Sequence, residues 1–226
     1  MRKIANFIAG LAVGVTTIFA AAPAFAYSYS GTGAVGYAHL YACNGTDCHN
    51  PQYLYLGSDC ANFVSQAIHD GGGLTYIKPG TSSTAWYYQV ANFFGFIDYV
   101  GPQSWVSASS LYAQLVASNR LSSIANPTMS LKYSGANSGD IYLYDWGHGE
   151  GFSHVSLATD NGNFVNYYDS NYQINYTAIT GGSGSRMVQH TTDRDWAPWN
   201  FGYWTENDPN IRSQMKTKIL RIAPNG

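Results

Sequence analysis

The sequence predicts an α+β protein in which N-terminal helices pack on an antiparallel sheet. In the first half of the chain, apolar residues recur at helical spacing, whereas beyond Asp140 they recur at the alternating spacing of strands. Residues 27–226 contain no internal repeat and no long linker, so we expect a single domain. Helices followed by strands are typical of the α+β class.

Three helices are expected in the first half. The first is expected to end near Cys43. It is predicted from the helical spacing of Ala34, Val35, Ala38, Tyr41 and Ala42. The second begins after Asp59, a favourable N-cap residue, and ends at the glycines 71–73. Ser107 is expected to cap a third helix that turns Leu111, Leu115 and Val116 inward.

The second half predicts strands. Residues 140–145 alternate, and 154–159 and 163–169 flank the turn sequence Asp160-Asn161-Gly162, which is typical of a hairpin. Further strands are expected at 186–190 and 216–222. The glycine-rich stretch 181–185 is interpreted as a flexible loop or insertion, and residues 73–108 show no clear pattern.

Residues 1–26 have the features of a secretory signal peptide. Arg2 and Lys3 precede an apolar run over 8–22, and the sequence Ala-Phe-Ala at 24–26 suits cleavage. We therefore expect a mature chain of residues 27–226 that is secreted, either extracellular or associated with the cell wall. No stable membrane insertion is expected after removal of the signal.

The composition limits the expected partners. The net charge is −2 and no basic stripe is present, so a nucleic-acid partner is not expected. Charged residues make up only 11% of the chain, whereas there are 19 Tyr and 24 Gly. A surface rich in hydroxyl and aromatic groups is common among secreted domains that face carbohydrate. Nothing in the sequence specifies an oligomeric state.

Three cysteines follow the predicted signal: Cys43, Cys48 and Cys60. Cys43 and Cys48 flank a short polar loop, and a disulfide between them would leave Cys60 as the free thiol. The alternative is that Cys60 is a buried, inert thiol. No CxxC or HxxxH spacing is present, so neither a metal nor another cofactor is expected.

Cys60 lies on the first turn of the second expected helix, where the helix dipole favours a thiolate. A cysteine nucleophile needs a base, usually histidine. His69 lies nine residues along the same helix and is too far to contact Cys60 directly. His154 begins the apolar strand segment 155–158, where sheet geometry would hold the ring toward a neighbouring helix. The alternative is a hydrogen-bonded structural histidine at this position.

Three segments carry a resemblance to a known family. Residues 59–66, DCANFVSQ, resemble the DCTNFVSQ signature of the putative amidase domain family, a secreted bacterial branch of the papain-like superfamily. Residues 139–141 and 153–159 resemble the same family and its relatives, the NlpC-type and CHAP cell-wall hydrolases. Residues 189–194, QHTTDR, are similar to the family's later His-Thr segment.

The resemblance implies a papain-like cysteine amidase or peptidase. Cys60 would be the nucleophile and His154 the general base, with acyl transfer through Cys60 and an amide bond of peptidoglycan or another peptide as substrate. Ala61 stands where the family usually has Thr, and this side chain is not expected to react.

A third group should orient the imidazole of His154. The resemblance favours His190, with Asn166 and Asp169 as alternatives. In the predicted hairpin, a two-residue loop places Asp169 opposite His154, whereas a three-residue loop places Asn166 on its face. The backbone N–H of Cys60 is the expected oxyanion donor.

Two other functions remain open. One is acyl transfer to an amine, as in transglutaminase-like relatives with the same Cys-His pair. The other is a non-catalytic wall-binding module on the same fold.

Overall fold

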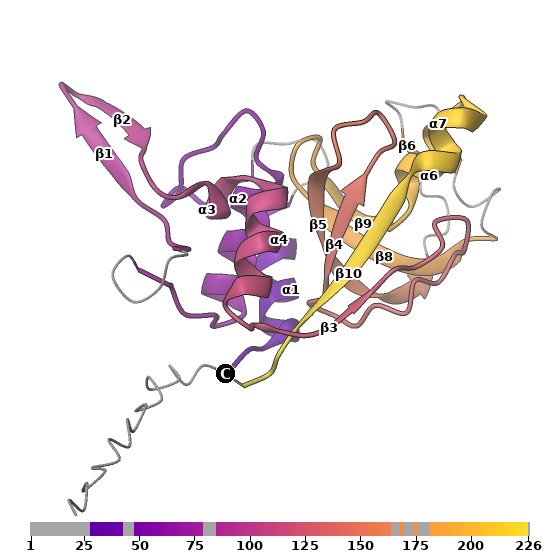
Figure 1. Ribbon diagram of the computed structural model, residues 1–226, viewed down its shortest axis with the longest axis horizontal. Helices are drawn as coiled ribbons and strands as arrows, with labels where there is room; N and C mark the ends of the chain where they lie inside the picture. The colour runs from indigo at the N-terminus through magenta and orange to yellow at the C-terminus, as the bar shows by residue number, and fades with distance from the viewer. Residues whose placement is uncertain are drawn as a thin grey trace, which may run out of the picture.

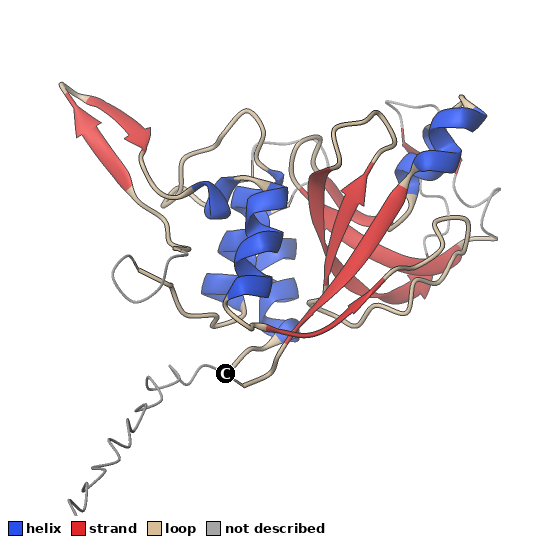
Figure 2. Ribbon diagram, viewed as in Figure 1, coloured by secondary structure: helices blue, strands red, loops and turns tan. Residues whose placement is uncertain are grey.

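The computed structural model describes residues 28–42, 48–78, 85–163, 168–169, 174–175 and 181–225. Its central feature is a six-stranded antiparallel sheet in the order β3-β10-β4-β5-β8-β9. N-terminal helices cover one side of this sheet (Figure 1; Figure 2). The predicted α+β class with an antiparallel sheet is therefore confirmed. Residues 1–26, the predicted signal peptide, lie outside the described residues.

The elements have the following bounds. The helices are α1 (Gly31–Tyr41), α2 (Cys60–Gln66), the π-helix η1 (Ala67–Gly71), α3 (Gln103–Val106), α4 (Ala108–Ala117), α6 (Phe201–Thr205) and α7 (Pro209–Gln214). The large sheet contains β3 (Leu121–Ala125), β4 (Ile141–Asp145), β5 (Phe152–Asn163), β8 (Ser183–Gln189), β9 (Arg194–Pro198) and β10 (Lys216–Ile222). Two small sheets pair β1 (Val90–Phe93) with β2 (Phe96–Tyr99), and β6 (Tyr168–Asp169) with β7 (Ile174–Asn175).

The large sheet buries a different cluster on each face because successive strand residues point to opposite sides. On one face, Val155 and Leu157 pack with α2 and α4 in the larger hydrophobic cluster. On the other face, Tyr142 and Tyr144 pack with Trp199 in a second cluster. Strand β4 is therefore buried on both faces, with Ile141 and Leu143 in the first cluster and Tyr142 and Tyr144 in the second.

The three expected helices are present, with two corrections. Val116 was predicted to face inward but is 47% exposed, whereas Ala108, Leu111 and Leu115 of α4 lie in the core. Asp59 precedes α2 as predicted, but its side chain makes no capping hydrogen bond. Its carboxylate binds other partners, which belong to the candidate site.

The predicted hairpin around 160–162 is wrong. β5 continues through this segment and pairs with β8, so that Asn161 lies opposite Ser185 and Gly162 opposite Gly184. The guanidinium of Arg186 lies over Gly162, where a Cβ atom would be 2.6 Å from Nη2. The absence of a side chain at Gly162 therefore makes room for Arg186, and the glycine does not form a turn. The predicted loop at 181–185 is also partly wrong, since β8 begins at Ser183.

Two features of the helical half concern packing and exposure. Gly33 of α1 contacts η1 so closely that a Cβ atom would lie 2.2 Å from the carbonyl oxygen of Gly71, which locks α1 beside the α2–η1 segment. The β1–β2 hairpin projects away from the body and exposes Phe94 and Phe96 (Figure 1). Among the described residues, no helix has the length and apolar character needed to cross a membrane.

Candidate active site

Cys60 begins α2 and contacts strand β5 beside His154. Its sulfur accepts hydrogen bonds from the backbone N–H groups of Val155 and Ala61. The ladder between β5 and β8 begins at the Leu157–Val188 pair, which leaves the β8 side of Val155 open to the sulfur. Cys60 is a free thiol, 4% exposed, and packs in the larger hydrophobic cluster.

Burial determines the protonation of this thiol. It raises the pKa of Cys60, and the carboxylate of Asp59 adds to the increase, whereas the hydrogen bonds from Val155 and Ala61 oppose it. The position of Cys60 at the N-terminus of a helix had instead predicted a lowered pKa for this thiol. The resting group is therefore a neutral thiol, and a base must remove its proton before the sulfur can attack a carbonyl.

His154 lies at the start of β5, and Gln189 of β8 holds its ring. Nε2 of His154 is 2.9 Å from Oε1 of Gln189. Because an amide oxygen can only accept, Nε2 carries the proton and Nδ1 keeps its lone pair. The amide nitrogen of Gln189 donates to the carbonyl of Thr192 at 3.1 Å, which fixes the orientation of the Gln189 amide.

The environment keeps His154 neutral. Burial lowers its pKa to about 4, and the positive charge of Arg194 adds to the decrease, while the hydrogen bond to Gln189 opposes it. At neutral pH the imidazole is therefore unprotonated at Nδ1 and can accept a proton. The thiolate expected at Cys60 is therefore not the resting form, and both reactive groups are neutral.

His190 does not hold the ring of His154. Its Nδ1 lies 2.7 Å from Oδ2 of Asp59, and its Nε2 lies 2.8 Å from the carbonyl oxygen of Tyr41. Both partners are acceptors, so both nitrogens donate and the ring is an imidazolium. Burial alone would lower the pKa of His190, but the hydrogen bonds to Asp59 and Tyr41 outweigh it and raise the pKa. The ring also stacks on Phe63 of α2 at 3.8 Å.

This buried ion pair fixes the residue that precedes Cys60. The side chains of His190 and Asp59 are 2% and 1% exposed. The other carboxylate oxygen of Asp59 accepts hydrogen bonds from the backbone N–H of Leu56 and the side-chain amide of Asn62. The pair therefore joins the start of α2 to the end of α1 and to the β8–β9 turn.

The β8–β9 turn is strained. Thr191 and Thr192 have φ angles of 66° and 63°, in the left-handed region that β-branched residues rarely adopt. The hydroxyl of Thr191 accepts the backbone N–H groups of Asp59 at 2.9 Å and Cys60 at 3.1 Å. The N–H of Cys60, the expected oxyanion donor, is thus already bound to Thr191.

A cavity of about 370 Å³ opens on the His154 side. Its walls include His154, Gln189, Thr191, Arg194 and Trp146. Cys60 is not among the residues that line it. The cavity therefore exposes the imidazole of His154, whereas the sulfur of Cys60 lies outside its lining.

The other sequence candidates have different outcomes. Asn166 lies outside the described residues. Asp169 belongs to β6, which pairs with β7 and not with β5, so the predicted hairpin alignment with His154 is absent. Cys43 also lies outside the described residues, and its disulfide with Cys48 stays a prediction.

Sequence reasoning missed Gln189. Leu157 lies opposite Val188, so Ser156 and Gln189 follow as neighbours on the same face, which His154 shares two residues away. His190 points to the other face. The resemblance to the family pointed to the segment 189–194. Only the pairing of β5 with β8 shows that Gln189, and not His190, faces His154.

Fold and site together define an α+β protein with a cysteine at a helix N-terminus and a histidine on the strand that contacts it. A model of the family described as "Putative amidase domain" matches residues 28–215, and the chain belongs to this family. That membership suggests amide hydrolysis.

The chain is also similar to the "Uncharacterized protein YjcM" of Bacillus subtilis (strain 168). The two are 28% identical over 154 residues, which cover 63% of this chain and 31% of the relative. The chain thus matches less than a third of that protein's length. No solved structure matches the chain.

Proposed function

We propose that this protein is a secreted cysteine amidohydrolase or peptidase of papain-like fold that hydrolyses amide bonds in peptidoglycan peptides. The observation that carries the cysteine mechanism is the contact between the Cys60 sulfur and the backbone of Val155, directly after His154. The family membership supports the amidase activity. The compartment and the cell-wall substrate rest on the signal-like residues 1–26 and on the family resemblance.

The mechanism begins from two neutral groups. Nδ1 of His154 takes the proton of the Cys60 thiol as the sulfur attacks the amide carbonyl carbon. The resulting imidazolium gives this proton to the nitrogen of the leaving amine, and the C–N bond breaks. Water then attacks the thioester with His154 as base, which releases the carboxylic acid and restores the thiol. Gln189 keeps the proton on Nε2 throughout.

Gln189 suits this sequence better than His190. A neutral amide orients the ring without stabilising the imidazolium strongly, which accords with the lowered pKa of His154. His190 and Asp59 act as positioning residues, because they hold the first turn of α2.

The oxyanion would need donors near Cys60. Since Thr191 accepts the N–H groups of Asp59 and Cys60, its hydroxyl occupies a place where a carbonyl oxygen could bind. In this proposal, substrate binding displaces Thr191 and frees both donors. The strained conformation of the Thr191–Thr192 turn favours such a movement.

One observation favours the alternative of a non-catalytic module, namely the 4% exposure of Cys60. Hydrolysis of purified peptidoglycan, measured as release of free amino groups, separates the two readings. The variant Cys60→Ala should lose all activity above background, and His154→Ala should lose at least 100-fold. His49→Ala, which changes an exposed histidine outside the cavity, should retain full activity.

Circular dichroism should show that both inactive variants remain folded. Hydrolysis that survives in Cys60→Ala would refute the cysteine mechanism. Absence of hydrolysis in the unaltered protein, with peptidoglycan binding retained, would identify a binding module instead.

A further inference from the structure

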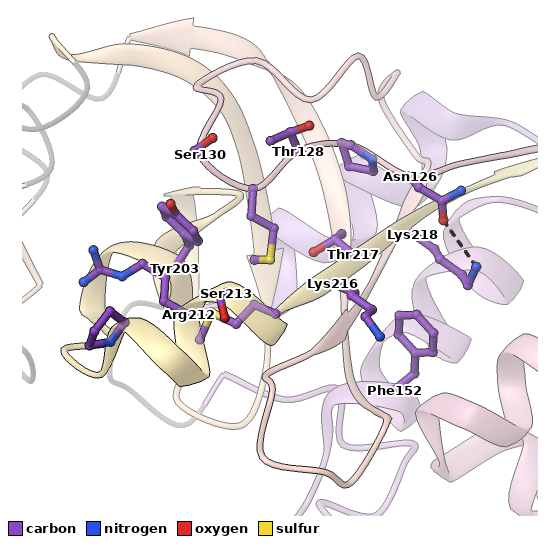
Figure 3. A pocket seen from close by; sticks show the side chains of 14 residues that line it. Asn126, Thr128, Ser130, Phe152, Tyr203, Arg212, Ser213, Lys216, Thr217 and Lys218 are labelled. Carbon is purple, nitrogen blue, oxygen red and sulfur yellow. Dashed lines mark hydrogen bonds between the residues drawn. The ribbon is translucent and has the colours of Figure 1, made fainter.

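A second, larger cavity lies beside the first residues of β10. It has a volume of about 710 Å³ and is bounded by the segment 126–130, the start of β10, and the C-terminal helices α6 and α7 (Figure 3). Met215 lines both this cavity and the one beside His154. The two cavities are therefore neighbours, with α6 contributing residues to each.

The start of β10 is an unpaired strand edge. The segment Lys216–Lys218 pairs with β4 on one side, while the pairing of β10 with β3 begins only at Ile219. Among the described residues, no strand is paired with the other side of Lys216–Lys218. An edge of this kind can accept an added strand from a peptide.

The charges at this edge are of one sign. Lys216, Lys218 and Arg212 line the cavity, and no carboxylate does so among the described residues. Lys216 lies opposite Asp145 in the ladder, but the carboxylate of Asp145 accepts the N–H of Gly147 and forms no ion pair with Lys216 in the described structure. These cations stand out in a chain with a net charge of −2.

Lys216 and Lys218 share one side of β10 because they are two residues apart. Figure 3 shows both on the side of Phe152. The ammonium group of Lys218 lies 5.4 Å from the centre of the Phe152 ring and 3.3 Å from Oδ1 of Asn126. An extended peptide would match this spacing with acidic residues at alternate positions.

Thr217 points to the opposite side of the strand and supplies a second observation. It is 3% exposed, lines the cavity, and its hydroxyl has no hydrogen-bond partner within the structure. Figure 3 shows Thr217 among the side chains that line this cavity. A buried hydroxyl without a partner is costly, and a polar group of a ligand would satisfy it.

We propose that this edge binds an extended acidic peptide as an added strand. Carboxylates at positions i and i+2 of the peptide would pair with Lys216 and Lys218, and a polar group of its backbone would bind Thr217. The apolar walls at Met129, Met215 and Tyr203 would contact the peptide side chains on the other face. That this peptide is part of the amidase substrate rests on the proposed function, whereas the binding itself does not.

Calorimetry with three capped pentapeptides tests this proposal on the unaltered protein. The sequence AEAEA should bind at least tenfold more tightly than its neutral isostere AQAQA. It should also bind at least fivefold more tightly than AEEAA, which has the same charge but places its carboxylates on opposite sides of an extended chain. Equal binding of AEAEA and AQAQA would overturn the acidic site, and equal binding of AEAEA and AEEAA would overturn the added strand.

Variants locate the site. The double change Lys216→Ala, Lys218→Ala should weaken AEAEA at least tenfold, whereas Lys132→Ala, which changes an exposed lysine outside the cavity, should leave binding unchanged. Thr217→Val should weaken the peptide several-fold without loss of stability, since it removes an unpaired buried hydroxyl. Unchanged affinity in the double variant would overturn the proposal. Because calorimetry needs no turnover, these results are independent of the Cys60→Ala experiment.

Discussion

Burial controls the chemistry of both candidate reactive side chains. It raises the pKa of Cys60 and lowers that of His154 to about 4, so each group favours its neutral form at pH 7. A neutral pair can still perform nucleophilic catalysis if the base takes the proton during attack, as serine hydrolases do. The group on Nε2 of His154 then decides how strongly the ring holds that proton.

Substitution of Gln189 tests this role directly. We expect Gln189→Ala to lower kcat at least tenfold with little change in KM, because the imidazole loses its orientation. Gln189→Glu places a carboxylate on Nε2, which raises the pKa of His154. The acidic limb of kcat/KM, expected near pH 4 in the unaltered protein, should therefore move to higher pH.

The pH profile of kcat/KM shows whether Gln189 orients the ring of His154 or only stabilises the fold. If Gln189 only stabilises the fold, Gln189→Glu should change the melting temperature and leave the acidic limb where it was. His190→Ala provides the comparison, since it should mainly destabilise the protein by leaving Asp59 buried without its cation.

Local sequence signals were sufficient for the helices and not for the sheet partners. Ser107, Asp59 and the glycines at 71–73 mark helix ends, and the observed helices α2, η1 and α4 agree with them. The Asn161-Gly162 turn signal failed because Arg186, distant in sequence, lies over Gly162 and β8 pairs through this segment. The role of Gln189 was not predicted because it too depends on the pairing of β5 with β8.

The β8–β9 turn stores conformational strain that glycine would relieve. Thr192 is exposed, and its φ of 63° is unfavourable for a β-branched residue. We expect Thr192→Gly to raise the free energy of unfolding by about 1 kcal/mol. Urea denaturation measures this change, with Thr205→Gly in helix α6 as a control that should lower stability by about a few tenths of a kcal/mol. A loss of stability in Thr192→Gly would show that the turn is not strained.

His154 and His190 give the whole protein an unequal response to pH, because the pKa of one is lowered and that of the other is raised. The folded pKa of His154, about 4, lies below the unfolded value of about 6.5, so protonation favours the unfolded chain as pH falls through this window. The pKa of His190 is raised, so its contribution is complete below about pH 6.5 and is lost as pH rises through its folded pKa.

Unfolding free energies at pH 7 and pH 4 test this linkage. His154 should contribute a loss on the order of 3 kcal/mol between these values, and His154→Gln should remove most of that difference. An identical acid-induced loss in His154→Gln would show that His154 is not the group responsible.

Covalent trapping tests the central claim that Cys60 attacks an amide carbonyl with help from His154. The protein is mixed with a peptidoglycan peptide, quenched in acid within the first turnover, digested, and examined by mass spectrometry. We predict an acyl group on the proteolytic fragment that contains Cys60, and we predict that this group forms at least 100-fold more slowly in His154→Ala. Turnover without an adduct on Cys60, or an adduct that forms equally fast in His154→Ala, would contradict it.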